Sequence, residues 1–292
     1  MQSPKLTIGM ATYDDFDGVY FSIQAIRMFH SEIINDIEFL IIDNNPGGEH
    51  GKEIKNFCNH IKNIKYVPFE IYKSTAVRNK IFEHASSPSV LSMDCHVFFE
   101  AGSLKKLIDY YDLNPDSKNL LQGPLIYDDL KNISSHFNPI WQSQMYGVWA
   151  TDQRACDKNG EPFEIPMQGL GVFSCRKDAW LGFSHLFRGF GGEEGYIHEK
   201  FRQHGNKTLC LPFLRWLHRF PRPNGVKYPL LLENKIKNYF ISYAELKLDP
   251  QPVINHFKEW KKEEDLIRMN EQILVEMGLR MSAADLAFSK LL

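Results

Sequence analysis

Short apolar runs alternate with segments of helical periodicity along the first third of the chain. Apolar runs of strand length occur at Lys5 to Met10, Ile37 to Ile42 and Lys65 to Phe69. Helical spacing predicts one helix over Phe16 to His30 and another from about Glu49 to Lys62. The first helix would bury one face, made of Val19, Ile23, Ile26 and Phe29. Strands that alternate with helices predict an α/β fold with a mostly parallel central sheet flanked by helices.

A fourth apolar run, Ser89 to Phe99, contains the polar residues Asp94 and His96. Residues two apart in a strand project to the same side, so both side chains would point together from the strand end. A carboxylate oxygen beside a neutral imidazole nitrogen suits a divalent ion such as Mn²⁺, which can hold a diphosphate. The alternative is a hydrogen-bonded core histidine next to a turn-forming aspartate, which is the commoner explanation for an isolated Asp-x-His.

Further polar residues follow the other predicted strands. The segment Ala11 to Asp15 leaves the first strand, Asp43 ends the second, and a helix predicted over Thr75 to His84 carries Arg78. The carboxyl ends of parallel strands share one edge of an open α/β sheet, where such folds bind nucleotides. The sequence therefore predicts a nucleotide site at this edge, together with Asp94.

The second half of the chain has two more segments that carry candidate chemistry. Gly191 to Glu194 precedes and opens a helix predicted over Glu193 to His204, and His218 follows later. Alone, the glycines could form only a tight turn, and the glutamates could only favour the helix N-terminus. A histidine such as His218, among aromatic and basic neighbours, is more often a surface residue than a ligand. Their joint presence with Asp94-Cys95-His96 in one α/β chain favours a shared site.

The end of the chain is expected to be helical. Pro252 to Met277 predicts one long amphipathic helix whose apolar positions would pack on the main domain or on a second subunit. Ser282 to Asp285 is typical of a capping box that opens a short last helix. We therefore expect a catalytic domain over residues 1–228 and a helical extension over residues 229–292, with a homodimer through its helix as one option.

Composition indicates a protein with a large core but says little about its binding partner. The 292 residues are 43% hydrophobic, which suffices for a large core, and the formal net charge is −2. This charge gives no general attraction for nucleic acid or anionic membranes. A local basic cluster could still bind a phosphate-rich acceptor or close over a diphosphate; it comprises Arg215, Arg219, Arg222 and Lys227.

Nothing in the sequence suggests a membrane span or secretion. No apolar run approaches the roughly 20 residues that cross a bilayer, and the polar opening Met1 to Lys5 does not resemble a signal peptide. The five cysteines are scattered and form no Cys-x-x-Cys pair, so they are expected to be reduced thiols. A soluble cytoplasmic protein is therefore expected.

Residues Leu6 to Phe220 resemble the nucleotide-sugar glycosyltransferases of the GT-A fold. Asp94-Cys95-His96 stands where that superfamily has an Asp-x-Asp motif, and its Asp-x-His form is similar to the polypeptide N-acetylgalactosaminyltransferases. The segment Thr75 to Asn79 resembles a family 2 segment whose arginine approaches the diphosphate. The segment Trp216 to Phe220 resembles the Val-Gly-His segment that supplies a third metal ligand in those enzymes.

Two later blocks carry the more specific part of this resemblance. Glu164 to Phe173 and Gly189 to Glu194 resemble, in order and spacing, the Gly-Gly-Leu-Phe and Trp-Gly-Gly-Glu-Asn blocks of the polypeptide N-acetylgalactosaminyltransferases. The chain departs from the second block at Phe190, where those enzymes have tryptophan, and at Glu194, where they have asparagine.

The resemblance implies a Rossmann-like catalytic domain that takes a sugar from a nucleoside diphosphate sugar, with a UDP-sugar as the expected donor. It implies Mn²⁺ or Mg²⁺ held by Asp94, His96 and His218. The implied donor contacts come from Ala11, Tyr13, Asp43, Arg78, Asp94, Gly171 and Gly192. Glu194 is the candidate general base of an inverting reaction, while Glu193 would hold sugar or acceptor hydroxyls. The Asp-x-His likeness favours retention slightly, and Glu194 would then only position substrates.

Two other classes of protein stay open at this stage. One is a metal-dependent nucleotidyl enzyme such as a sugar pyrophosphorylase, although no Gly-rich, Lys-bearing phosphate loop lies near the first strand. The other is a non-catalytic protein that binds nucleotide sugars, which the presence of all three proposed ligands disfavours. The acceptor could be a glycan, a protein or a modified nucleic acid, and the sequence does not distinguish them.

Overall fold

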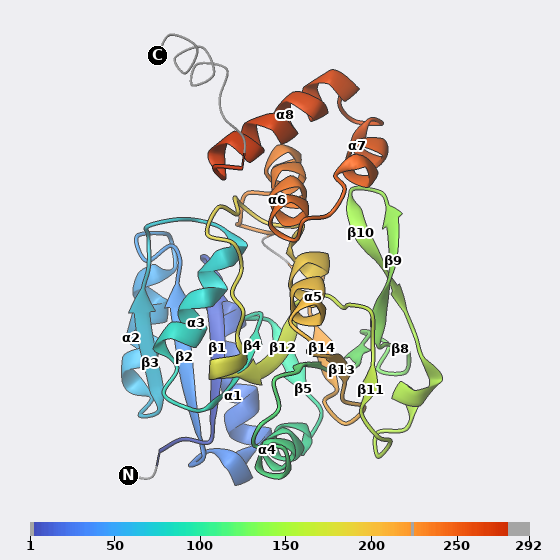
Figure 1. The fold of residues 1–292 in the computed structure, drawn as a ribbon. Helices are drawn as coiled ribbons and strands as arrows, with labels where there is room; N and C mark the ends of the chain where they lie inside the picture. Colours follow the sequence, from blue (N-terminus) through green and yellow to red (C-terminus); the bar gives the residue numbers. More distant parts are fainter. Residues whose placement is uncertain (1–2, 223–224, 280–292) are drawn as a thin grey trace.

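The computed structural model describes residues 3–222 and 225–279 of the chain. An eight-stranded sheet forms its centre, in the order β11-β13-β6-β12-β4-β1-β2-β3 (Figure 1). One half of the sheet is parallel and consists of β1 Leu6–Thr12, β2 Ile37–Asp43, β3 Ile64–Pro68 and β4 Ser89–Met93. The other half consists of β6 Leu120–Gln122, β11 Phe163–Glu164, β12 Val172–Arg176 and β13 Thr208–Cys210. The expected α/β fold with a largely parallel central sheet is confirmed.

Helices cover both faces of this sheet. One apolar cluster joins the sheet to α1 Phe16–Phe29, α2 Gly51–His60 and α4 Ser103–Leu113. The other joins it to α3 Asn79–His84 and α5 Glu193–Gln203. The expectation that Phe29 is buried is wrong, because this last residue of α1 is 65% exposed. Ile33, in the 3₁₀ turn Ser31–Ile33, is buried in the first cluster instead.

The segment that carries Asp94 and His96 is a turn and not a continuous strand. The strand β4 ends at Met93, and β5 Val97–Phe99 belongs to a separate four-stranded sheet of order β5-β14-β7-β8. The remaining strands of this small sheet are β7 Leu125–Ile126, β8 Ile133–Ser134 and β14 Trp216–His218. The polar pair thus lies where the chain passes from one sheet to the other, so the sequence prediction of one strand over Ser89 to Phe99 is wrong.

Two segments that were each predicted as one helix are divided in the structure. The segment predicted as one helix over Thr75 to His84 is a 3₁₀ turn over Thr75–Arg78 followed by α3. The segment predicted over Pro252 to Met277 is α7 Gln251–Phe257 and α8 Glu263–Glu276. The break places two short apolar stripes in the core, which one straight helix would not do; they comprise Val253, Ile254, Phe257, Leu266, Met269 and Ile273.

A helix that the sequence pattern did not single out, α6 Leu232–Glu245, packs between α5 and the last two helices. Helices α6, α7 and α8 stack at one end of the molecule (Figure 1), and their apolar side chains share one cluster with the sheet. The division at residue 228 and the homodimer stay predictions. The proposed capping box at Ser282 to Asp285 lies outside the described residues.

A long β-hairpin extends beside α5 and α6 (Figure 1). Its strands are β9 His136–Gln142 and β10 Met145–Ala150, which pair antiparallel with an irregularity between Tyr146 and Val148. Two further 3₁₀ turns lie at Gln153–Cys156 and Lys177–Ala179. None of the helices in the described ranges has the length and apolar character needed to cross a membrane.

Candidate active site

Asp94, His96 and His218 meet at the carboxyl end of the parallel strands, just beyond β4. The Nε2 atoms of the two histidines lie 3.1 Å apart, and Asp94 Oδ2 lies 3.5 Å from His218 Nε2 and 3.9 Å from His96 Nε2. One ligand atom from each residue falls within 4.8 Å of the others. Both imidazoles are buried. The structure therefore brings together all three residues that the sequence assigned to a metal ion.

Pairing between β5 and β14 joins residues far apart in sequence at this point. His218 pairs with Val97, the residue that directly follows His96. Gly171 supports the arrangement from below: its carbonyl accepts a 2.8 Å hydrogen bond from Asp94 N–H, and a Cβ on it would lie only 2.9 Å from Trp216. Gly171 thus allows close packing beneath the ligands, and it does not line the adjoining cavity.

Asp15 orients His96, and the sequence analysis did not identify it. Its Oδ2 accepts a 3.0 Å hydrogen bond from His96 Nδ1, which leaves Nε2 directed toward Asp94 and His218. Its Oδ1 accepts from Gly18 N–H and caps α1. Burial alone would raise the pKa of Asp15, but the hydrogen bond with His96 and the charge of His96 lower this pKa below its usual value. The only signal in the sequence is an aspartate before a helix, which any N-cap would show.

Arg78 connects the metal ligands to the start of α5. Its Nη2 lies 3.0 Å from Asp94 Oδ1 and its Nη1 lies 3.4 Å from Glu193 Oε1, and both Arg78 and Glu193 are buried. Burial alone would raise the pKa of Asp94, but its hydrogen bond to His218 and the charges of Arg78 and His96 hold it well below its usual range. Asp94 is therefore ionised at neutral pH, as a metal ligand must be.

The two glutamates behave differently from Asp94. Burial and the neighbouring Glu194 raise the pKa of Glu193, against the opposing charge of Arg78. Burial also raises the pKa of Glu194. Glu193 Oε2 has no hydrogen-bond partner among the described residues. Gly192 has a φ of 90° at the N-cap of α5, a conformation that favours glycine, and this turn positions both carboxylates.

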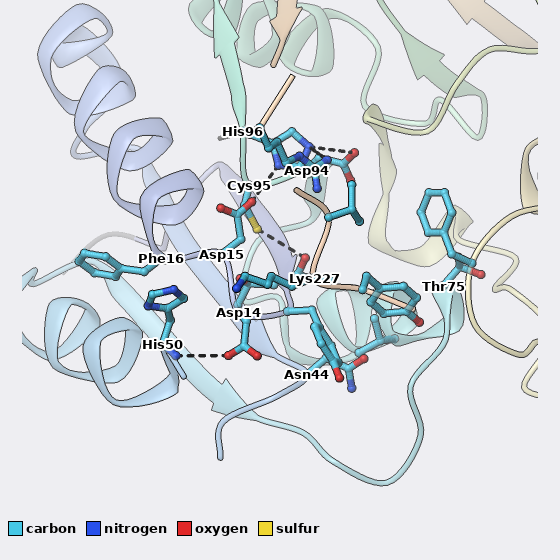
Figure 2. A pocket seen from close by; sticks show the side chains of 18 of the residues that line it. Asp14, Asp15, Phe16, Asn44, His50, Thr75, Asp94, Cys95, His96 and Lys227 are labelled. Atoms are coloured by element: carbon cyan, nitrogen blue, oxygen red, sulfur yellow. Dashed lines mark hydrogen bonds and ion pairs between the residues drawn. The ribbon is translucent and has the colours of Figure 1, made fainter. Parts of the chain in front are cut away.

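A cavity of about 240 Å³ opens beside the three ligands, and we call it the metal-side cavity. Figure 2 shows Asp94, Cys95 and His96 at one end of it, with Asp14 and Asn44 toward the other. Of the predicted donor contacts, those that line it are Ala11, Tyr13, Arg78 and Asp94. Those that do not line it are Asp43, Gly171 and Gly192, and neither do the predicted catalytic residues Glu193 and Glu194.

Asp43 lies behind the cavity wall. Its side chain is fully buried, and its carboxylate accepts from Asn45 N–H at 3.0 Å and from the Tyr66 hydroxyl at 2.8 Å. The next residue, Asn44, lines the cavity; its Nδ2 donates to backbone carbonyls, while its buried Oδ1 has no partner in the described part of the chain. This placement favours Asn44 over Asp43 for direct contact with a bound group.

The segment after β14 forms one wall of the same cavity. Arg219, Arg222, Lys227 and Tyr228 line it, and the Tyr228 ring lies edge-on to Tyr13 with centroids 5.1 Å apart. Arg222 Nη2 donates to His96 Nε2 at 2.6 Å. Arg215 is separate from this group, since it donates to the backbone carbonyls of Ala155 and Cys156. The basic cluster expected from the sequence is thus divided between two places.

The donor set fits a divalent ion. One ionised carboxylate and two imidazoles with facing Nε2 atoms are ligands that Mn²⁺ accepts. The hydrogen bond from His96 Nδ1 to Asp15 is the outer contact that commonly orients a ligating histidine. Asp94, His96 and His218 could therefore hold a metal ion.

One protein family and several solved structures resemble this chain. The model of glycosyl transferase family 2 matches residues 7–176. A comparison with curated protein sequences gives no match. Among solved structures, GalNAc-T7 with UDP, GalNAc and Mn²⁺ is similar at a TM-score of 0.64 and 14% identity, over 93% of this chain and 55% of that one.

Two further solved structures have the same fold. The mannosyltransferase PcManGT from Pyrobaculum calidifontis, in complex with GDP-Man and Mn²⁺, has a TM-score of 0.57 and 12% identity over 99% of this chain and 80% of that one. TarS from S. aureus has a TM-score of 0.55 and 11% identity over 89% of this chain and 44% of that one. At these identities the likeness shows the fold alone. The family model covers more than half of the sequence, so the chain belongs to glycosyl transferase family 2 and is a glycosyltransferase of the GT-A fold.

Proposed function

We propose that the chain transfers a sugar from a UDP-sugar to a hydroxyl group of an acceptor, in a reaction that needs Mn²⁺ or a similar ion and retains the anomeric configuration. The observation that carries this proposal is the convergence of Asp94, His96 and His218 beside the buried Arg78, at the end of a cavity with aromatic walls. Mn²⁺ in two similar structures supports the choice of ion.

The bound ion would neutralise the negative charge that gathers on the departing diphosphate. The chain adds fixed positive charge in the same place. Arg78 is held by Asp94 and Glu193, while Arg219 and Arg222 also line the cavity. Such preorganised charges stabilise a leaving group without reorganisation during the reaction.

Two observations support uridine as the nucleoside. The unpartnered amide oxygen of Asn44 is an acceptor suited to the imide N–H of uracil. Tyr13 and Tyr228 line the cavity and offer ring surfaces against which a base can pack. UDP is also present in the similar structure of GalNAc-T7.

Retention is favoured because neither glutamate lines the metal-side cavity, and Glu193 is held by Arg78. In this course the acceptor oxygen bonds to C1 on the face from which the diphosphate departs. The bond between C1 and the β-phosphate oxygen breaks, and the acceptor proton passes to an oxygen of the departing diphosphate. An inverting course with Glu194 as general base is the second candidate, favoured by the carboxylate at the start of α5.

Metal-dependent hydrolysis of a panel of nucleotide sugars, measured with the whole chain and no acceptor, tests the proposal. We expect release of UDP from at least one UDP-sugar, and loss of this release when EDTA removes the ion. Equal release with and without EDTA would contradict the metal assignment. Turnover of GDP-sugars alone would contradict the choice of uridine.

A further inference from the structure

A second cavity, of about 620 Å³, lies against α5. Its walls are the β9–β10 hairpin, the segment Glu164 to Met167, and helices α5 and α6. Figure 1 shows the hairpin beside α5, with α6 above α5. We call it the hairpin cleft. Its volume is within the range of ordinary ligand pockets. Pro139, Glu164 and Leu248 are exposed at its rim, so the cleft is accessible from solvent.

Tyrosine rings form the walls of the hairpin cleft. Tyr146 comes from the hairpin, and Tyr239 and Tyr243 come from α6. Trp141 supports the first two from behind, with ring centroids 4.9 Å from Tyr146 and 4.8 Å from Tyr239. These rings are therefore held in place before any ligand binds. Ring faces of this kind pack against the C–H faces of a sugar or against another flat group.

The polar groups of the cleft select among such ligands. The buried Tyr239 hydroxyl accepts from Tyr146 N–H at 2.9 Å and donates to no residue that the structure describes, so its proton is available to a ligand. Glu164 at the rim and Glu199 on α5 offer carboxylate acceptors. Arg202 is the only cation among the described lining residues, and it is engaged by Glu199 at 2.9 Å and by the Pro166 carbonyl.

This chemistry favours a neutral ligand rich in hydroxyl groups over a phosphate chain. A nucleic-acid backbone needs several free cations, and here acidic groups exceed basic ones. A sugar residue meets each feature of the cleft. Its ring packs on tyrosine, one of its oxygens accepts from the Tyr239 hydroxyl, and its hydroxyl groups donate to the carboxylates.

The cleft also adjoins the reaction centre. Gly192 lines the hairpin cleft, while Phe190, two residues earlier, lines the metal-side cavity. The residue after Gly192 is Glu193, which contacts Arg78 at 3.4 Å, and Arg78 contacts Asp94 at 3.0 Å. The short segment Phe190 to Gly192 therefore reaches both spaces. A chain of sugars in the cleft would therefore end close to the transferred sugar.

We propose that the hairpin cleft binds a sugar residue of the acceptor, so that the acceptor is a glycan. This inference rests on the proposed transferase function and names its substrate class. Tyr243 is the residue to change, because its ring lines the cleft and its hydroxyl has no hydrogen bond to any described residue.

The experiment uses the full chain with Mn²⁺ and four trisaccharides, namely maltotriose, cellotriose, chitotriose and mannotriose. Saturation-transfer NMR measures their binding, and a transfer assay measures KM for the acceptor. We expect at least one trisaccharide to bind. For that sugar, Tyr243→Ala should raise KM about 10-fold through loss of ring packing. Tyr243→Phe, which keeps the ring, should leave KM unchanged.

Tyr110→Ala on α4 is the matched control, since Tyr110 lines neither cavity. It should change neither acceptor KM nor UDP-sugar hydrolysis. The inference is overturned if no trisaccharide binds, or if Tyr243→Ala leaves acceptor KM unchanged. Transfer only to a peptide or an oligonucleotide would also overturn it. Failure of the wild-type chain to bind UDP with Mn²⁺ would instead contradict the proposed function, because trisaccharide binding is measured separately.

Discussion

The metal-side cavity and the hairpin cleft share the short segment Phe190 to Gly192, and they are built from opposite kinds of side chain. The first is bordered by an aspartate, a histidine and three arginines, of which one contacts the aspartate and another the histidine. The second has tyrosine walls and a single cation that is already paired. Charge is thus concentrated where a diphosphate would depart, while ring surface is concentrated where only recognition is needed.

This contrast predicts that variants of one cavity will spare the other. Changes among the charged groups should affect nucleotide and metal binding and leave sugar binding in the hairpin cleft unaltered. Changes at Gly192, the N-cap of α5, should affect both, because Gly192 lines the hairpin cleft and Phe190, two residues earlier, lines the metal-side cavity.

The largest effect is expected from His96→Ala and His218→Ala. Each removes one of three ligands, so UDP binding with Mn²⁺ should weaken by at least about 100-fold. Calorimetry of UDP binding with and without EDTA measures this loss. His60→Ala, at an exposed histidine on α2, is the control and should bind like the wild type. Tight binding that neither EDTA nor the substitutions change would refute the metal site.

Asp15→Asn should weaken Mn²⁺ binding by about 10–100-fold, the usual effect of losing the outer partner of a ligating histidine. The substitution is selective because asparagine still accepts the hydrogen bond from Gly18 N–H that caps α1. Titration with Mn²⁺, followed by electron paramagnetic resonance, measures the affinity. Asp17→Asn on the same helix turn serves as the control, and an equal loss there would show that Asp15 acts only through general charge.

The buried histidine His198 should make the free energy of unfolding depend on pH. It is fully buried in α5, donates from Nδ1 to the Glu194 carbonyl, and burial lowers its pKa to about 3. In the unfolded chain this imidazole binds a proton near pH 6.5, whereas in the folded chain it stays neutral at that pH. The free energy of unfolding should therefore fall as the pH decreases below the unfolded pKa, by about 2 kcal/mol between pH 6.5 and 5.

Urea unfolding at pH 7 and pH 5 measures this change. A His198→Gln variant should be less stable at pH 7 but should lack that part of the pH dependence. Buried carboxylates whose pKa is raised, such as Glu193, act with the opposite sign, so the difference between wild type and variant isolates His198. An unchanged pH dependence in the variant would show that another group is responsible.

The sequence predicted the parallel half of the fold well, because its signals are local. Strands β1, β2 and β3 lie within two residues of the predicted runs. β1 and β2 are mostly apolar because both of their faces are covered. The β9–β10 hairpin was missed because its residues alternate without a uniformly buried face and include Pro139, which argues against a central strand. The hairpin cleft, which depends on it, was therefore not predicted.

The candidate site was predicted in part for a similar reason. Asp94, His96 and His218 are recognisable by type and order, but their convergence depends on pairing between β5 and β14. The sequence could not show that Asn44, and not Asp43, faces the cavity. Adjacent residues of a strand point to opposite sides, and which side faces the cavity is known only when the strand is placed in the sheet. Asp15 was hidden because capping a helix and orienting a histidine look the same in sequence.

The smallest effect on rate is expected from Glu194→Gln, and it tests the stereochemical part of the proposal. A general base contributes about 10²–10⁴-fold, so an inverting enzyme would lose most of its turnover in this variant while keeping its affinity for the donor. Retention leaves the acceptor proton to the departing diphosphate, so turnover should fall by less than about 10-fold. Glu193→Gln should then matter as much, because it alters the contact with Arg78. NMR of the first-formed product gives the anomer directly. An inverted anomer together with severe loss in Glu194→Gln would assign Glu194 as the base and extend the reacting groups to the N-terminus of α5. A retained anomer with a mild loss would confine the bond-breaking chemistry to the metal-side cavity.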